Sequence, residues 1–375
     1  MLVQQGADME PYRESRCCHT SPKIEHGRNR HEAAARVEPT HRWGRRPPVR
    51  RRRIIVPLAV ISLCLVTGGA VWAQKLSGMV AVLYAGSLGA VVDKGLTPAV
   101  ERTTGYGVQG EGHGSVAAAR MIRDRLRTPD VFISADPAVN SSILMGRQNR
   151  GLVEWYLTFA SADLVIGYNP KSRFKEDFEQ VRAGKLAWYD VLAKPGVKFG
   201  RTDPNLDPKG YRALFLFELA ERHYRRPGLV ALLGGPVNPA QIFPEPELLI
   251  RMESGQLDAA VFYRHEVVAH ALPFIELPDE VNQSNPRLAP LYGERRYTTD
   301  RGMTVMGVPI LFTITIPTTV RNAAGALAFV RFVLSEQGRA VLTQHGLHPA
   351  PVLVGGDRAK VPAELRGSIE GPYTP

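Results

Sequence analysis

The sequence predicts a two-lobed α/β protein, and three observations lead to that prediction. The chain has 375 residues, which suits two domains of roughly 100–200 residues each. Apolar residues make up 44% and charged residues 22%, as in globular proteins and unlike disordered or fibrous ones. Short apolar runs alternate with helical segments, an order typical of parallel sheets covered by helices. The alternation restarts midway along the chain, which indicates a second lobe inserted into the first.

The elements of the first lobe follow from apolar runs and helical periodicity. We expect strands and helices in alternation over 79–85 (strand), 88–103 (helix), 106–110 (strand), 116–126 (helix) and 130–133 (strand). A further buried strand covers 160–168.

The second lobe repeats the alternation, and the chain then returns to the first. Its expected helices are 174–183, 208–224 and 246–254, and its expected strands lie near 197–200, 240–243 and 258–263. A strand-rich return over 303–316 and two closing helices, 323–334 and 336–345, complete the pattern, with Gly346 as a C-terminal stop. We expect the segment from Gly355 to be peripheral.

The N-terminus carries an export signal. Residues 1–53 hold 13 Lys and Arg against 6 Asp and Glu, and the apolar run 54–73 follows. A basic block before an apolar run keeps the first part cytoplasmic and sends the rest outward. We expect 1–53 to be a disordered cytoplasmic leader and 54–74 to be a signal or transmembrane segment. Cleavage after Ala73 is favoured, and a retained anchor is the alternative.

Charge and cysteine content exclude several classes of function. Most of the net charge of +11 lies in the leader, so the folded part lacks the basic footprint of a nucleic-acid-binding protein. The three cysteines are Cys17, Cys18 and Cys64. The exported body therefore has no disulfide, no thiol nucleophile and no cysteine metal site.

Two serines follow strands of the first lobe, where loops enter helices and ligands bind in open sheets. Gly86 and Ser87 come after the first strand, and Gly114 and Ser115 come before the helix that begins near 116. Exposed N–H groups at such turns can hold an anion, and the serine hydroxyl adds a donor. The alternative for each serine is a helix N-cap without a ligand.

Polar residues at comparable places in the second lobe complete the candidate site. Asp203 and Asn205 follow a strand, whereas Asp207 before Pro208 is explained as a helix N-cap. Glu245 begins a helix, where the helix dipole favours an acidic residue on structural grounds alone. Tyr263 ends a strand, and packing with a satisfied hydroxyl is its alternative role.

A serine hydrolase is the enzyme alternative. The AGSLG segment resembles a nucleophile elbow, with Ser87 as the nucleophile and His345 or His348 as later partners. The elbow follows the first strand of the exported body, whereas that fold places it after several strands.

Together the motifs resemble a known family. YAGSL, GSVAAARMI, TDPNLDPKGYR and LDAAVFYRHEVV are similar to the archaeal-type branch of molybdate/tungstate-binding proteins of ABC importers, over about residues 78–350. The resemblance implies a type II periplasmic-binding-protein fold, with two α/β lobes, a ligand cleft and two crossover strands. On this basis we expect the first lobe over 75–164 and 271–375, and the second over 165–270.

The resemblance also implies a ligand site. Gly86, Ser87 and Ser115 would bind oxyanion oxygens from the first lobe, and Asp203, Pro204, Asn205, Glu245 and Tyr263 would contribute from the second. Asp203 and Glu245 would ligate the molybdenum or tungsten centre of the anion. Lys209 stands where relatives often have Cys, and we expect it to be solvated.

The function implied is that of a non-enzymatic receptor outside the cytoplasmic membrane, either periplasmic or anchored through 54–73. It would pass tungstate or molybdate to an ABC permease, act as a monomer and need no cofactor. Two carboxylates that ligate the metal centre would discriminate against sulfate, whose sulfur has no room for extra ligands. Phosphate or another oxyanion is the alternative ligand, and a membrane-tethered sensor lobe is a further alternative function.

Overall fold

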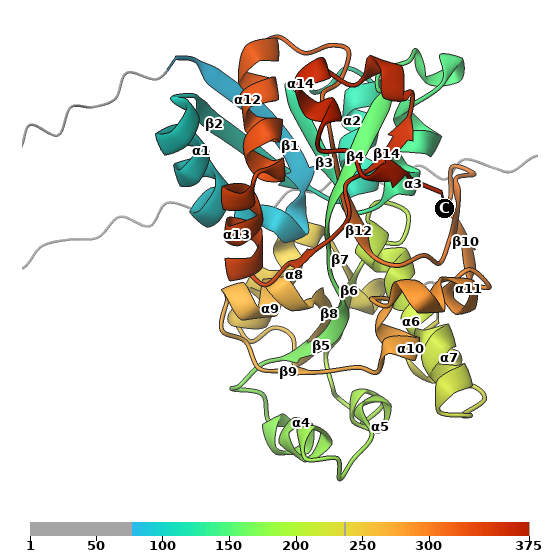
Figure 1. Ribbon diagram of the computed structural model, residues 1–375. Helices are drawn as coiled ribbons and strands as arrows, with labels where there is room; N and C mark the ends of the chain where they lie inside the picture. Colours follow the sequence, from blue (N-terminus) through green and yellow to red (C-terminus); the bar gives the residue numbers. More distant parts are fainter. Residues whose placement is uncertain (1–76, 236–237, 375) are drawn as a thin grey trace, which may run out of the picture. The chain divides into compact units, whose positions relative to one another are not determined.

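The computed structural model describes residues 77–235 and 238–374, which form two β-sheets with flanking helices and a separate two-stranded hairpin (Figure 1). The predicted leader and the apolar run 54–73 lie outside the described residues. Among the helices that the structure does describe, none has the length and apolar character needed to cross a bilayer.

The first sheet has the strand order β15-β14-β4-β12-β3-β1-β2, and β13 also pairs with β4. Its strands are β1 (Met79–Ala85), β2 (Gly107–His113), β3 (Val131–Ser134), β4 (Trp155–Ser161), β12 (Leu311–Thr315), β13 (His348–Pro349), β14 (Leu353–Gly356) and β15 (Gly371–Pro372). Strand β1 is parallel to β2 and β3, whereas β12 is antiparallel to β3 and β4. The sheet is therefore mixed, whereas the alternation of strands and helices alone indicated parallel pairing.

The second sheet has the order β7-β6-β8-β5-β9. Its strands are β5 (Leu164–Tyr168), β6 (Phe199–Thr202), β7 (Ile242–Phe243), β8 (Ala259–Tyr263) and β9 (Phe274–Ile275). Strand β6 is parallel to β7 and β8, and β5 is antiparallel to β8 and β9. The parallel strands β6 and β8 end where the polar segments predicted for the second lobe begin.

The chain passes from the first sheet to the second between Ser161 and Leu164. The predicted single strand 160–168 is thus two strands, β4 and β5, in different sheets. The return runs from β9 through α10 (Asp279–Asn282), α11 (Ala289–Tyr292) and the hairpin β10–β11 (Arg296–Thr298 and Thr304–Met306) to β12. The lobe limits at 164/165 and 270/271 stay predictions.

Helices cover both faces of the first sheet. Side chains alternate along β1, so Val80, Val82 and Tyr84 share one face and Leu83 the other. The first face packs in one core cluster with α12 (Ala323–Leu334) and α1 (Thr97–Thr104), whereas Leu83 packs in another with α2 (Ser115–Arg123). Figure 1 shows α12 and α1 near β1 and β2.

Side-chain caps begin some of the remaining helices. Asp207 caps α6 (Pro208–His223) and Ser335 caps α13 (Glu336–Gln344). The predicted helix 88–103 is helical from Gly89 to Thr104, with a π-helical stretch over Val91–Leu96. Pro98, which lacks an N–H, lies near the start of the α-helical part, α1. The other helices are α3 (Pro137–Val139), α4 (Lys175–Arg182), α5 (Trp188–Leu192), α7 (Leu229–Leu232), α8 (Glu245–Glu253), α9 (Arg264–Ala269) and α14 (Ala363–Arg366).

The C-terminal segment belongs to the core of the first lobe. Strand β14 pairs with β4, and Val361 and Leu365 are buried. The prediction that the segment from Gly355 is peripheral is therefore wrong, because its few apolar residues are spaced to cover one end of the sheet.

Candidate functional site

Two turns of the first lobe meet two carboxylates of the second. A Cβ added at Gly86 would lie 1.7 Å from Glu245 Oε2, and one added at Gly114 would lie 3.1 Å from Asp207 Oδ2. The N–H of Ala117 on α2 also donates to the carbonyl of Leu206 at 3.0 Å. The lobes are therefore closed on one another here, and a side chain at 86 would displace the Glu245 carboxylate, which fills that space.

The two predicted serines lie on the first-lobe side of this junction, and both are buried. Ser87 lies in a 3₁₀ turn, Gly86–Leu88, directly after β1. Ser115 is the first residue of α2, whose N-cap is Gly114, so the expectation that Ser115 is the N-cap is wrong. Its Oγ accepts the N–H of Ala135 at 3.0 Å, which leaves its own O–H to donate elsewhere.

The segment 203–205 has contacts other than those predicted. Asp203 Oδ1 accepts the N–H of Asn205 at 2.8 Å and so folds its own loop. Asn205 Oδ1 accepts the hydroxyl of Tyr297 at 3.0 Å, and therefore faces the hairpin β10–β11. Pro204 packs against Gly210, where an added Cβ would lie 2.5 Å from the proline nitrogen. These contacts are structural, and the ligand roles of the three residues stay predictions.

The carboxylate that lies with Glu245 at the junction is Asp207, which sequence reasoning explained only as a cap. Its Oδ1 does cap α6, accepting the N–H of Lys209 at 2.6 Å and the hydroxyl of Thr202 at 3.2 Å. Its Oδ2 faces Gly114 across the junction. Burial, followed by the nearby charge of Glu245, raises the pKa of Asp207 to about 7.

Glu245 is placed as predicted, as the first residue of α8, and its side chain is buried. Its Oε1 accepts a hydrogen bond from Lys209 Nζ at 3.0 Å. Its Oε2 is buried and accepts no hydrogen bond from the described part of the chain. A buried carboxylate oxygen without a hydrogen-bond donor is energetically costly. Glu245 Oε2 is therefore a candidate contact atom for a ligand.

Lys209 is the largest departure from expectation. Its side chain is 1% exposed, and Nζ lies 3.0 Å from Glu245 Oε1 and 2.6 Å from Glu266 Oε1. The prediction that Lys209 is solvated is wrong, because these two acidic residues follow it in sequence by 36 and 57 positions and no local pattern connects them. Burial lowers the pKa of Lys209, but Glu266, Glu245 and Asp207 outweigh burial and raise it.

Tyr263 lies beside Lys209, whose Nζ is 5.6 Å from the centre of its ring, and it is almost completely buried. Its hydroxyl accepts a hydrogen bond from Arg212 Nη1 at 2.9 Å, and its N–H donates to Glu266 Oε2 at 2.8 Å. Burial raises the pKa of Tyr263, so the hydroxyl keeps its proton at neutral pH. That proton can be donated to a ligand because Arg212 uses only a lone pair of the oxygen.

Sequence reasoning missed an ion pair that connects the lobes. Arg212 Nη2 on α6 lies 2.9 Å from Oδ2 of Asp136, the residue that caps α3, and both side chains are buried. Tyr211 donates its hydroxyl to the same oxygen at 2.9 Å. In the sequence, the Asp136–Pro137 pair indicates a helix cap and the GYR segment indicates a helix. Neither local pattern indicates that Asp136 and Arg212 form an ion pair.

The arrangement does not form the predicted hydrolase pair. His348 lies 3.2 Å from Asp163, and His345 packs where a Cβ on Gly95 would be. The histidine beside Ser87 is His265, whose Nε2 contacts the carbonyl oxygen of Ser87 at 3.1 Å rather than its hydroxyl. Burial lowers the pKa of His265 to about 3, so the ring is neutral and donates this hydrogen bond.

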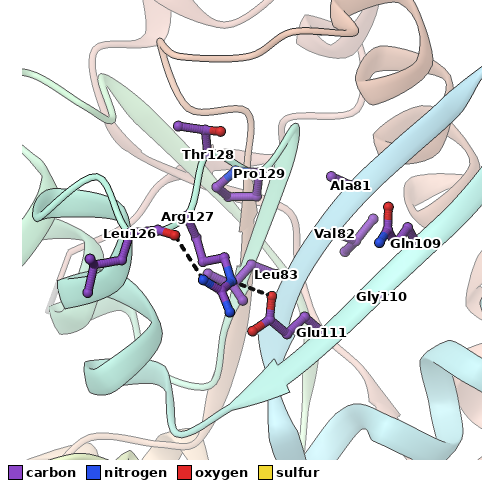
Figure 2. Close-up of a pocket in the computed structure, with 10 residues that line it drawn as sticks. All are labelled: Ala81, Val82, Leu83, Gln109, Gly110, Glu111, Leu126, Arg127, Thr128 and Pro129. Atoms are coloured by element: carbon purple, nitrogen blue, oxygen red, sulfur yellow. Dashed lines mark hydrogen bonds and ion pairs between the residues drawn. The ribbon is translucent and has the colours of Figure 1, made fainter.

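Two cavities adjoin the junction between the lobes. The two, of about 260 Å³ each, share Glu245 and Pro246; one is also lined by Ser87 and the other by Gly114, Asp203 and Asp207. A cavity of about 510 Å³ lies elsewhere. Figure 2 shows it between β1, β2 and the segment 126–129, with Arg127 paired to Glu111. It contains none of the candidate residues, so size does not identify the site.

Two α/β lobes that close over buried polar groups from both sides define a solute-binding protein. The chain belongs to the family of bacterial extracellular solute-binding proteins, which it matches over residues 80–348.

Relatives with informative names support this assignment. A putative ABC transporter molybdenum-binding protein of Haloferax volcanii is 39% identical, covering 66% of this chain and 76% of that protein. The molybdate/tungstate-binding protein WtpA of Thermococcus kodakarensis is 29% identical, covering 70% and 77%. The periplasmic molybdate-binding protein of Azotobacter vinelandii shares the fold with a TM-score of 0.51, at 17% identity, covering 72% of this chain and 98% of that one.

Proposed function

We propose that the chain captures tungstate or molybdate outside the cytoplasmic membrane and delivers it to an ABC permease. The observation that carries the proposal is the pair Asp207 and Glu245. Each has one oxygen held by the protein, whereas the other faces a glycine of the first lobe. Relatives named for molybdenum, molybdate and tungstate support the choice of ligand.

The chemistry of the pair favours a metal oxyanion over sulfate. Two carboxylates repel a dianion in a partly dry site unless their oxygens approach an atom of high positive charge. Molybdenum and tungsten can accept such oxygen ligands, whereas the sulfur of sulfate cannot. The hydroxyls of Ser87, Ser115 and Tyr263 supply donors for the anion's own oxygens.

Phosphate is the second candidate, and one observation favours it. Glu245 Oε2 is a buried acceptor without a donor, and the proton of hydrogenphosphate could fill that place. The proposal therefore needs an experiment that separates the two kinds of anion.

Binding would act through closure of the two lobes. Contacts of Ala117 with Leu206 and of Asp136 with Arg212 join the lobes in this closed arrangement. An anion that touches both lobes stabilises the closed form, which the permease would recognise. In this role the protein acts as a monomer and without catalysis.

The direct test is ligand-induced thermal stabilisation. Purified protein is heated with tungstate, molybdate, sulfate or phosphate, and bound metal is measured by mass spectrometry. At a thousandfold excess over the dissociation constant, a ligand stabilises the folded state by about 4 kcal/mol, so the melting temperature should rise by several degrees. Stabilisation by phosphate and not by tungstate or molybdate would replace the proposed ligand.

Glu245→Gln tests the role of the carboxylate. It should weaken tungstate binding at least tenfold, since an amide oxygen is a poorer ligand for a highly charged metal centre. Glu247→Gln is the matched control, because Glu247 lies on the same first turn of α8 but is exposed and paired with Arg251. An unchanged dissociation constant in Glu245→Gln would contradict the assigned site.

Export is tested separately by the N-terminal sequence of the protein recovered from cells. A start at Gln74 would support cleavage, and an intact 54–73 in the membrane fraction would support a retained anchor.

A further inference from the structure

The buried side chain of Lys209 contacts charged residues at the candidate anion site, and packing alone does not explain its position. Its Nζ lies between Glu245 Oε1 at 3.0 Å and both oxygens of Glu266 at 2.6 and 2.9 Å. It also lies 5.6 Å from the centre of the Tyr263 ring. The ammonium thus contacts one residue that faces the candidate ligand and a second residue that holds Tyr263 in place.

Without Lys209, the buried carboxylates around it would have no neighbouring cation among the described residues. Asp207, Glu245 and Glu266 are three buried carboxylates. The other groups that face this cluster offer little compensation: Tyr263 and His265 are neutral. Arg212 is paired with Asp136. Lys209 is therefore the cation in contact with these carboxylates within the described part of the chain.

The geometry also fixes which oxygen of Glu245 remains available. Lys209 binds Oε1, and Oε2 is left buried against Gly86 without a hydrogen bond from the residues that the structure describes. A carboxylate held by one oxygen cannot rotate to chelate through both. It can present a single oxygen to a guest, with part of its charge already neutralised by the ammonium.

We propose that Lys209 is a specificity-determining residue of the anion site: it holds Glu245 by one oxygen and balances Glu245 and Glu266, so that a doubly charged anion can enter beside them. This inference rests on the proposed function and deepens it. Lys209 acts through Glu245 and is a positioning residue as well as a counter-charge.

Removal of the ammonium should weaken anion binding. In Lys209→Met, Glu245 and Glu266 lose the cation that contacts both of them, and Glu245 also loses the hydrogen bond that holds its Oε1. The carboxylates, without a neighbouring cation, should then repel the anion.

The experiment measures tungstate and molybdate dissociation constants by calorimetry at pH 8.5, on proteins shown to be folded by circular dichroism. Lys209→Met should lose at least 100-fold in affinity. Lys209→Met/Glu266→Gln removes one positive and one negative charge together, so it should bind at least tenfold better than the single variant at pH 8.5. Lys94→Met is the control, because Lys94 lines the neighbouring cavity but is exposed.

The outcomes separate this inference from the proposed function. If the native protein binds neither tungstate nor molybdate, the proposed function fails. If the native protein binds but Lys209→Met keeps native affinity at pH 8.5, Lys209 has no such role and the function stands. A folded double variant no better than Lys209→Met would overturn charge balance, because a packing role cannot be restored by removing a carboxylate charge.

Discussion

Gly86→Ala should prevent the lobes from closing around an anion. A Cβ at this position would lie 1.7 Å from Glu245 Oε2 and 2.9 Å from its Cδ, whereas ordinary contacts begin at 3.4 Å. The Glu245 carboxylate, which is the far end of a flexible side chain, must move by more than about 1 Å, or the lobes must separate. A movement of that size also breaks the 3.0 Å hydrogen bond between Glu245 Oε1 and Lys209.

The expected magnitude follows from that broken contact. A hydrogen bond to a charged group contributes about 1.5–3 kcal/mol. Since each 1.4 kcal/mol is tenfold in affinity, the dissociation constant for tungstate should rise about 10- to 100-fold. Gly86 and Glu245 belong to different lobes, so opening relieves the clash without unfolding either one. The free energy of unfolding of the ligand-free protein should therefore change by less than about 1 kcal/mol.

Calorimetry with tungstate and urea unfolding measure the two quantities. Gly89→Ala is the matched control, because it lies three residues later and an added Cβ there would meet nothing within 4 Å. Gly86→Ala in a Glu245→Ala background should cause little further loss, since the clashing carboxylate is gone. Native affinity in Gly86→Ala, or an equal loss in Gly89→Ala, would refute the reasoning.

Two further predictions concern buried charges near the site. Arg212→Met should lower the free energy of unfolding by about 3–5 kcal/mol, because it leaves the Asp136 carboxylate buried without its cation. Urea unfolding measures this change, and a value below about 1 kcal/mol would contradict the stabilising role of the buried ion pair. The pKa of Asp207 is raised above its unfolded value to about 7, so its contribution to stability is complete below about pH 4 and is lost as the pH rises through 7. Asp207→Asn can still accept the cap hydrogen bond but does not titrate. The free energy of unfolding of this variant should therefore fall less between pH 4 and 7 than that of the native protein. An equal fall in both proteins would contradict the raised pKa of Asp207.

The sequence predicted those elements whose signals are local. The helix α6 begins at Pro208 because Asp207 accepts the N–H of Lys209, and both residues are visible in the TDPNLDP segment. The turn at Gly86 and Ser87 follows from an apolar strand that ends in a glycine. Such signals require only neighbours in the chain, and sequence reasoning could therefore find them.

Contacts between the lobes could not be predicted in the same way. Asp207 was explained by its cap, but a cap uses only one oxygen, and the direction of the other depends on Gly114 in the other lobe. Asp203 had the same residue type and no local explanation, although its oxygen binds the N–H of Asn205. The ligand role assigned to Asp203 stays a prediction, and the structure adds Asp207 as a second acid at the same cavity.

The buried lysine follows from the charge that surrounds it. Three helices of nine or more residues, α2, α6 and α8, begin at the junction, and each N-terminus counts for about half a positive charge. Those half charges offset about half of the charge on Asp207, Glu245 and Glu266, and a dianion would then add two more negative charges. A full cation within 3.0 Å of Glu245 reduces that excess where the anion must approach. Because an isolated buried ammonium is itself costly, Lys209 can stay there only with both glutamates, and so Lys209 and Glu266 should be interpreted as one unit of the site.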